Sequence, residues 1–303
     1  MSIYVIGDLH IKPSEPHLKA VRKLFDFLNM VVTKDDSIVQ LGDFFDSSSV
    51  HHSIVHEFID RTKKIGKHWY ILRGNHDQSI IRGNILLPFD HFDHISVFET
   101  SEYLEIEGKL CYMFPYMKNV KEQIENISWT GDFAFFHLTN PEDEFVTGEG
   151  INTDNIEAFQ VFGHTHIHKK YKTSRGYDKV ILGTPLCTRQ GEQNNSILKI
   201  SDTKIEHIDH GITFAYEDID YGTFPVSKDN IINVKKAPSV KSVYDMYKDY
   251  YIREEGIELL IDETIGEETF SFHAGNIKES FVSYSKEKSI RDELVKKGLE
   301  YLV

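Results

Sequence analysis

The first 77 residues alternate short apolar runs with longer amphipathic segments, and a polar motif follows each apolar run. The apolar runs cover residues 3–6, 38–41 and 69–72. Between them, apolar side chains recur at helical spacing in two segments, the first after Ser14 and the second up to Ile65. This order predicts a β-α-β-α-β unit, whose parallel strands end at one edge of a sheet. We therefore expect the polar motifs to meet at that edge.

After residue 90 the chain changes to many short strands separated by turns. Glu107-Gly108 is a typical turn between two of them and predicts a hairpin. The expected strands cover residues 94–100, 103–106, 110–114, 133–136, 159–162, 179–182, 197–200 and 204–208. Together with the opening unit they predict an α/β fold, a two-sheet mixed β-sandwich that is flanked by helices.

The motifs that carry chemistry all lie before residue 226, and we place a domain boundary there. The expected domains are 1–226, which contains the site, and 227–303, a small α-rich appendage. Two segments of the appendage have the apolar spacing of amphipathic helices, residues 239–251 and 286–302.

Composition narrows the functions that such a fold can have. The net charge of −14 argues against a broad nucleic-acid-binding surface, because contacts to phosphates normally come from clustered Lys and Arg. The negative net charge is still compatible with a local phosphate-binding site whose positive charge comes from metal ions. The two cysteines provide neither a disulfide framework nor a cysteine-rich zinc site. The N-terminus lacks a signal-peptide pattern and no apolar run could span a bilayer, so we expect a soluble, cytoplasmic protein without membrane contact.

Five short motifs combine carboxylates, imidazoles and one amide oxygen, and each follows a predicted strand. They are Asp8-x-His10, Gly42-Asp43-x-x-Asp46, Gly74-Asn75-His76-Asp77, His137 and Gly163-His164-x-His166. Taken singly, a Gly-Asp pair is usually a turn and a lone histidine is usually structural. As an ordered set at one sheet edge, they indicate a metal site. This mixture of ligands suits manganese, iron or zinc, and does not suit calcium or a thiolate site.

The ordered set resembles the motifs of the calcineurin-like metallophosphoesterases over roughly residues 1–210, with all five motifs intact. Within that superfamily the chain is most similar to the SbcD-type DNA double-strand-break repair nucleases and their bacteriophage relatives. The additional likeness consists of Gly183-Thr184-Pro185, then Gly191-Glu192, and a helical C-terminal segment. Gly-Thr-Pro is equally compatible with an ordinary tight turn.

The resemblance implies two divalent metal ions, with manganese as the first candidate and iron, zinc and magnesium as alternatives. It implies that one carboxylate bridges the two ions. The implied ligands are Asp8, His10, Asp43 and His166 for one ion and Asp43, Asn75, His137 and His164 for the other.

Other residues of the motifs receive supporting roles. The resemblance implies that His76 is catalytic and faces the phosphate, where it would stabilise developing charge or protonate the leaving oxygen. Asp46 and Asp77 are candidates to orient ligands or loops from behind. Arg73, His51 and His52 are candidates for substrate contact, because they lie close to the motifs in sequence.

The implied reaction is hydrolysis of a phosphoester, and the substrate class is open. The preferred hypothesis is a DNA nuclease, an exonuclease with endonuclease activity, that works in DNA repair and recombination as a subunit of an SbcCD-like complex. The alternative is a phosphoprotein phosphatase or a phosphodiesterase for small molecules or cyclic nucleotides, which the acidic charge favours. A scaffold that had lost catalysis would have lost ligands, and every motif here is complete.

A partner is expected at the C-terminal helices. Val243, Met246, Tyr247 and Tyr250 fall at i, i+3, i+4 and i+7 of a helix, and such aromatic and methionine side chains are typical of interfaces. The resemblance implies that these helices bind the coiled coil of an SbcC-type, SMC-like ATPase. Packing of the helices on each other or on the phosphoesterase domain is the alternative, and a homodimer is also open.

Overall fold

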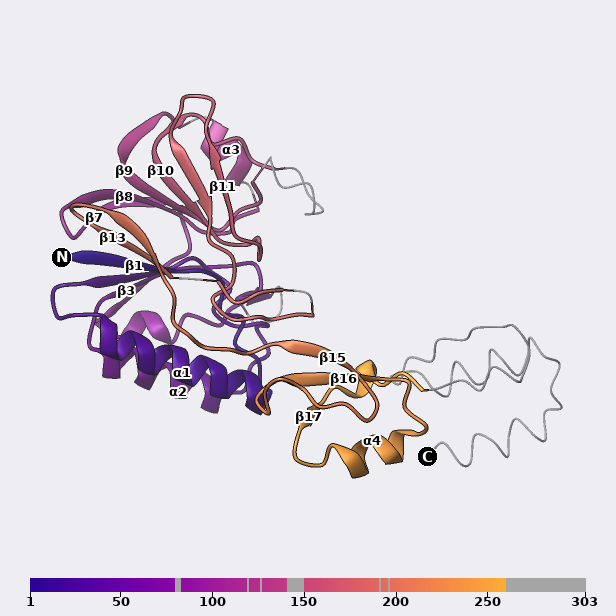
Figure 1. Ribbon diagram of the computed structural model, residues 1–303. Coiled ribbons are helices and arrows are strands. Elements are labelled where there is room, and N and C mark those ends of the chain that lie inside the picture. Colours follow the sequence, from indigo (N-terminus) through magenta and orange to yellow (C-terminus); the bar gives the residue numbers. More distant parts are fainter. Residues whose placement is uncertain are drawn as a thin grey trace. The chain divides into compact units, whose positions relative to one another are not determined.

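The computed structural model (Figure 1) describes residues 1–259 except 80–82, 119, 126, 141–149, 191 and 196. It forms two compact units, Met1–Ala215 and a second that begins at Tyr216. The division predicted from the sequence lies near residue 226. The difference arises because β15 (Tyr216–Asp220) pairs in parallel with β16 (Ile231–Lys235), so both strands belong to one sheet of the second unit.

The first sheet of the larger unit contains the predicted β-α-β-α-β unit. Its strand order is β14-β13-β1-β2-β3-β6. The strands are β1 (Ser2–Ile6), β2 (Ser37–Gln40), β3 (Trp69–Leu72), β6 (Ile95–Phe98), β13 (Ile197–Ser201) and β14 (Ile205–Ile208). Strands β1, β2, β3 and β6 are parallel. Their carboxyl ends therefore lie at one edge, as the sequence analysis expects.

Two long helices cover the outer face of this sheet (Figure 1). Helix α1 (Glu15–Val31) begins after Ser14 with a proline in its first turn, and α2 (His52–Ile65) ends at Gly66 in a left-handed conformation. Phe25 of α1 stacks on Trp69 of β3, with ring centroids 5.4 Å apart. The buried face of α1 is thus fixed to the sheet by aromatic packing.

The second sheet has the strand order β11-β12-β10-β9-β8-β7. Its strands are β7 (Glu102–Ile106), β8 (Lys109–Phe114), β9 (Trp129–Phe136), β10 (Ile156–Phe162), β11 (Lys169–Lys172) and β12 (Asp178–Ile181). The predicted hairpin is present, because β7 and β8 pair antiparallel around Glu107-Gly108. Helix α3 (Val120–Glu125) lies beside this sheet (Figure 1), and a small ribbon of β4 (Gln78–Ser79) and β5 (Gly83–Asn84) and a short turn η1 (Phe89–His91) lie in the connections.

The main core lies between the two sheets, as expected for a sandwich with helices outside. Along β9, Phe133 and Phe135 face the other sheet, whereas Ala134 and Phe136 face outward and pack with Ile124 of α3. Both faces of β9 are therefore buried. The inner core also includes Val5, Val39, Leu72, Met113, Val161 and Leu198. The α/β sandwich that the sequence predicts is confirmed.

The described part of the second unit is a small parallel sheet with one short helix. Its strand order is β15-β16-β17, with β17 (Tyr251–Ile252), α4 (Val240–Met246) and the turn η2 (Glu254–Gly256). The sequence pattern predicts helices here and does not indicate this sheet. It also predicts a helix over 239–251, but α4 ends at Met246. The second expected helix, 286–302, lies outside the described residues.

The apolar stripe expected on the helix over 239–251 is divided between core and surface. Val243 and Tyr247 are buried in the core of the second unit with Ile232 and Val234. Met246 is 40% exposed, and Tyr250 is partly buried beside Tyr247. Among the described helices, none combines the length and apolar character that crossing a bilayer would require.

Candidate metal centre

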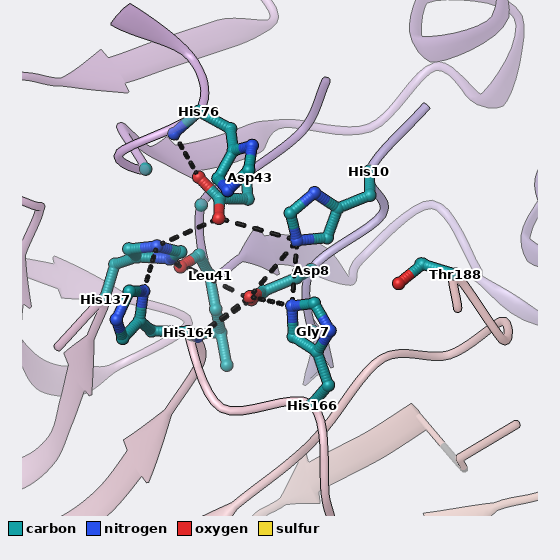
Figure 2. Close-up of polar contacts among 12 residues, drawn as sticks. Gly7, Asp8, His10, Leu41, Asp43, His76, His137, His164, His166 and Thr188 are labelled. Carbon is teal, nitrogen blue, oxygen red and sulfur yellow. Dashed lines mark hydrogen bonds and ion pairs between the residues drawn. The ribbon is translucent and has the colours of Figure 1, made fainter. Parts of the chain in front are cut away.

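The five motifs converge in the larger unit, where the carboxyl ends of β1, β2 and β3 meet those of β9 and β10 (Figure 2). Backbone hydrogen bonds tie the motifs together. The amides of Leu9 and His10 donate to the carbonyl of Asp43 at 3.1 and 2.9 Å, and Gly163 N–H donates to Phe136 O at 2.8 Å. The loops that follow separate strands thus form one surface.

The first cluster of donor atoms comprises Asp8, His10 and His166. The Nε2 atoms of His10 and His166 lie 2.9 Å apart. His166 Nε2 lies 3.8 Å from Asp8 Oδ2. His10 and Asp8 follow β1, whereas His166 follows β10, so one strand end from each sheet contributes.

The second cluster comprises Asp43, His137 and His164, with Asn75 beside them. Asn75 Oδ1 lies 3.0 Å from His137 Nε2 and 2.9 Å from His164 Nδ1. His137 Nδ1 donates to the carbonyl of Leu41 at 2.7 Å. That hydrogen bond turns Nε2 of His137 toward the cluster.

Asp43 lies between the two clusters. Its Oδ2 atom is 3.5 Å from His10 Nε2 and 3.4 Å from His137 Nε2, so a single oxygen faces both groups of imidazoles. Its Oδ1 accepts a hydrogen bond from the backbone N–H of His76 at 2.8 Å. This position suits a carboxylate that is shared by two ions.

The backbone at the site is held in unusual conformations. His10, Asp43 and His164 have positive φ angles of 42°, 49° and 72°. Such conformations cost about 1–3 kcal/mol each and persist where the surroundings determine them, typically at functional sites. A Cβ atom on Gly74 would lie 2.0 Å from Asp43 Oδ1, and one on Gly163 would lie 2.5 Å from Asp8 Oδ1. The motif glycines therefore make room for carboxylates of other motifs.

Asp77 and Asp46 contact the backbone and the ring nitrogens on the side of the motifs away from the two clusters. The buried Asp77 accepts backbone hydrogen bonds from Gly74, Phe45 and Phe44 at 2.9, 3.0 and 3.3 Å, so it joins the second and third motifs. Asp46 Oδ1 lies 3.3 Å from His10 Nδ1. The carbonyl of Asp46 accepts from His76 Nδ1 at 2.7 Å.

Two residues outside the predicted site residues also stabilise the site. Glu192 Oε1 accepts a hydrogen bond from His166 Nδ1 at 2.6 Å. The buried Gln40 side chain accepts from Gly42 N–H at 3.0 Å and donates to Gly42 O at 2.6 Å, which fixes the turn before Asp43. The signal for Gln40 is a buried polar residue at the end of an apolar strand. Glu192 belongs to the Gly191-Glu192 pair of the SbcD-type likeness, but its contact with His166, 26 residues away, is not visible in the sequence.

The candidate catalytic and substrate-contact residues lie in different surroundings. His76 contacts His10 edge-to-face, with ring centroids 4.7 Å apart, and His10, Asp43 and His76 also form a group of potential ligands. Arg73 donates to Tyr116 O at 2.9 Å and pairs with Glu99 at 3.4 Å. His51 and His52 are exposed at the start of α2, where His51 Nδ1 accepts from Ser53 N–H. Their roles in catalysis and binding stay predictions.

The electrostatics of the site fit divalent cations. The pKa of Asp8 is raised to about 7. Burial is the main cause, His137 opposes it, and nearby Asp43 adds to it. Burial would lower the pKa of His137, but Asp43 and Asp8 raise it to about 9. Two buried carboxylates thus face each other among imidazoles. A donor set of this kind is what divalent transition metals bind, and their charge would compensate both carboxylates.

Two clusters of potential metal ligands with one carboxylate facing both are typical of the metal-dependent hydrolases that use paired ions. The family model described as calcineurin-like phosphoesterase matches residues 1–168, more than half of the chain. The protein therefore belongs to the calcineurin-like phosphoesterases, which hydrolyse phosphoesters with divalent metals.

Solved structures similar to this chain include an archaeal phosphodiesterase. It has 15% sequence identity and a TM-score of 0.41, and the match covers 69% of this chain and 99% of that one. A protein of unknown function from Aquifex aeolicus has 18% identity and a TM-score of 0.31, with 52% of this chain and 88% of that chain covered. A comparison with curated protein sequences found no match.

Proposed function

We propose that this protein is a nuclease that hydrolyses phosphodiester bonds of DNA with two divalent ions, manganese first among the candidates. The observation that carries the catalytic part is Asp43 Oδ2, which faces the imidazoles of both clusters at 3.5 and 3.4 Å. The choice of DNA rests on the likeness to SbcD-type nucleases. Repair and recombination are the processes that this likeness suggests.

In this proposal the side chains divide between holding metal and handling the substrate. Asp8, His10 and His166 would hold one ion, Asn75, His137 and His164 the other, and Asp43 both. Bound there, the ions would supply Lewis acidity and a water of lowered pKa.

His76 would act on the substrate. Its Nδ1–H is donated to the carbonyl of Asp46, which leaves Nε2 as the ring atom available to the phosphate. From there the imidazole can protonate the leaving oxygen or stabilise its charge.

A phosphatase or a phosphodiesterase for small molecules is the second candidate, and a specific observation favours it. Two cations close to the motifs are engaged within the protein. Lys12 Nζ donates to Thr188 O at 2.5 Å and lies 3.8 Å from Asp46, and Arg73 donates to Tyr116 O. With a net charge of −14, DNA affinity would depend strongly on a partner.

The experiment compares three substrates in the presence of manganese. End-labelled duplex DNA, bis-p-nitrophenyl phosphate and p-nitrophenyl phosphate are each incubated with the full chain, with and without EDTA. A nuclease degrades the DNA, and EDTA abolishes the reaction. Turnover of a small ester with intact DNA, even at low salt, would favour the second candidate. The pattern of labelled products distinguishes exonuclease from endonuclease cleavage.

We also propose a partner, the SbcC-type ATPase, at the second unit. Support comes from exposed apolar side chains on and beside α4. Tyr244 and Met246 are each 40% exposed, and Val240 is 37% exposed. Exposed aromatic and methionine side chains of this kind are frequent at protein interfaces.

A further inference from the structure

Glu192 is held by hydrogen bonds on both carboxylate oxygens. Oε1 accepts from His166 Nδ1 at 2.6 Å. Oε2 accepts from the backbone N–H and the hydroxyl of Thr188 at 2.8 and 2.7 Å, and from Arg189 N–H at 2.9 Å. Only 12% of its side chain is exposed. Four donors therefore hold the carboxylate in one orientation, with one oxygen on the imidazole.

The hydrogen bond decides which nitrogen of His166 faces the metal position. A carboxylate can only accept, so Nδ1 of His166 carries the proton. Nε2 is then left with its lone pair, 2.9 Å from His10 Nε2 and 3.8 Å from Asp8 Oδ2. A carboxylate behind a metal-binding histidine fixes the ring and increases the basicity of the ligand nitrogen.

A carboxylate also lies behind the other histidine of the first cluster, as a charged neighbour that makes no hydrogen bond to the ring. His10 Nδ1 faces Asp46 Oδ1 at 3.3 Å. Lys12 lies between the two carboxylates. Its Nζ is 3.8 Å from Asp46 Oδ1 and donates at 2.5 Å to the carbonyl of Thr188, whose N–H and hydroxyl donate to Glu192. In the second cluster, by contrast, His137 Nδ1 donates to a neutral backbone carbonyl, that of Leu41.

We infer that Glu192 is a positioning residue for the metal position formed by Asp8, His10, Asp43 and His166, and that it makes this position the tighter of the two. The carboxylates of Glu192 and Asp46 lie behind the histidines of this position. At the other metal position, the backbone carbonyl of Leu41 lies behind His137. A carboxylate that accepts from the remote nitrogen of His166 makes this imidazole a more basic ligand than a backbone carbonyl makes His137, and this favours a divalent cation at the first position. The inference rests on the proposed two-metal site and does not depend on DNA being the substrate.

The test is a titration of the metal-free full chain with Mn²⁺. The free ion is measured at each step by electron paramagnetic resonance. We compare the wild type with Glu192→Gln, which keeps the shape of the side chain and removes its charge. Glu157→Gln is the matched control, because Glu157 lies at the start of β10 and pairs with Arg175 at 2.6 Å. Melting temperatures without metal are measured for all three.

The wild type should bind two ions, one more tightly than the other. Glu192→Gln should weaken the tighter position by about 10–100-fold, leave the weaker one unchanged, and still bind two ions at high Mn²⁺. Excess Mn²⁺ should also restore its rate. The control should behave as wild type.

Two results would overturn the inference. One is a Glu192→Gln variant with both Mn²⁺ affinities unchanged. The other is a variant that weakens both positions equally and melts at a lower temperature without metal, as a purely structural role of the Glu192 contacts with Thr188 and Arg189 predicts. If the wild type itself bound fewer than two ions, the proposed two-metal site would fail instead.

Discussion

Asp43 is the residue at which both metal positions can be tested with a single substitution. Asp43→Asn keeps the shape of the side chain and removes the charge that faces His10 and His137. We expect lower manganese content at both positions and a rate lower by about a thousandfold or more, because metal ions contribute several kcal/mol to such reactions. Elemental analysis and turnover of bis-p-nitrophenyl phosphate measure both. Two retained ions with normal turnover would refute the bridging role.

Substitution of His76 tests whether this residue acts in catalysis or in metal binding. His76→Asn should lower the rate by about 10²–10⁴-fold, the usual effect of losing an acid–base group, with near-normal metal content. Its side chain also lies in a group of potential ligands with His10 and Asp43. Loss of one ion together with the rate would therefore identify His76 as a ligand. Metal content measured on the same preparation distinguishes the two roles.

At the scale of elements, an ion-pair group joins the two helices that cover the first sheet. Glu57 of α2 accepts from Arg22 of α1 at 2.7 and 3.0 Å and from Arg61 at 2.9 Å. The hydrogen bond from Arg22 is the main reason that the pKa of Glu57 falls to about 2 from its usual 4.5. Since the folded state lowers this pKa, the pair stabilises the fold fully above pH 4.5. That stabilisation is lost as the pH falls toward 2.

Glu57→Gln should therefore lower the free energy of unfolding at pH 7 by about 1–2 kcal/mol, a value reduced from that of a charged hydrogen bond because the pair is partly exposed. The difference from wild type should shrink between pH 4.5 and 2. Urea unfolding at several pH values measures it, with Glu105→Gln on the exposed face of β7 as control. A difference that is constant with pH would contradict the assignment.

At the scale of the whole molecule, every described candidate ligand lies in the unit Met1–Ala215. A chain ending at Ala215 should therefore keep hydrolysis of bis-p-nitrophenyl phosphate within about threefold of wild type, since the packing around the site belongs to one compact unit. Circular dichroism melting verifies that the shortened chain is folded. A folded but inactive product would mean that the second unit contributes to the site.

The partner proposal is best tested by substitution in the second unit. Val243 and Tyr247 are part of its core, so removing residues 239–303 would disrupt that core as well as any interface. Tyr244→Lys combined with Met246→Lys changes exposed positions and should leave the melting temperature near wild type while abolishing binding to the SbcC-type ATPase. Met30→Lys, 76% exposed in the first unit, is the control. Unchanged co-purification of the double variant would reject this surface.

The second unit shows where local sequence patterns were insufficient. Apolar spacing predicts a helix over 239–251, but α4 ends at Met246. The apolar residues Val243 and Tyr247 pack in the core of the second unit. The parallel pairing of β15 with β16 joins Tyr216 to Ile231, and nothing in either segment alone specifies this register. Strand pairing between distant segments depends on contacts that local periodicity does not contain.

The sequence by itself determined the β-α-β-α-β order, the hairpin at Glu107-Gly108 and the donor atoms after each strand, because periodicity and turn chemistry act over neighbouring residues. The tertiary structure alone decided how those donors face one another. His137 is oriented by the carbonyl of Leu41 and His166 by Glu192, 96 and 26 residues away along the chain. Which nitrogen of an imidazole faces a metal depends on the partner of the other nitrogen, and only folding supplies that partner.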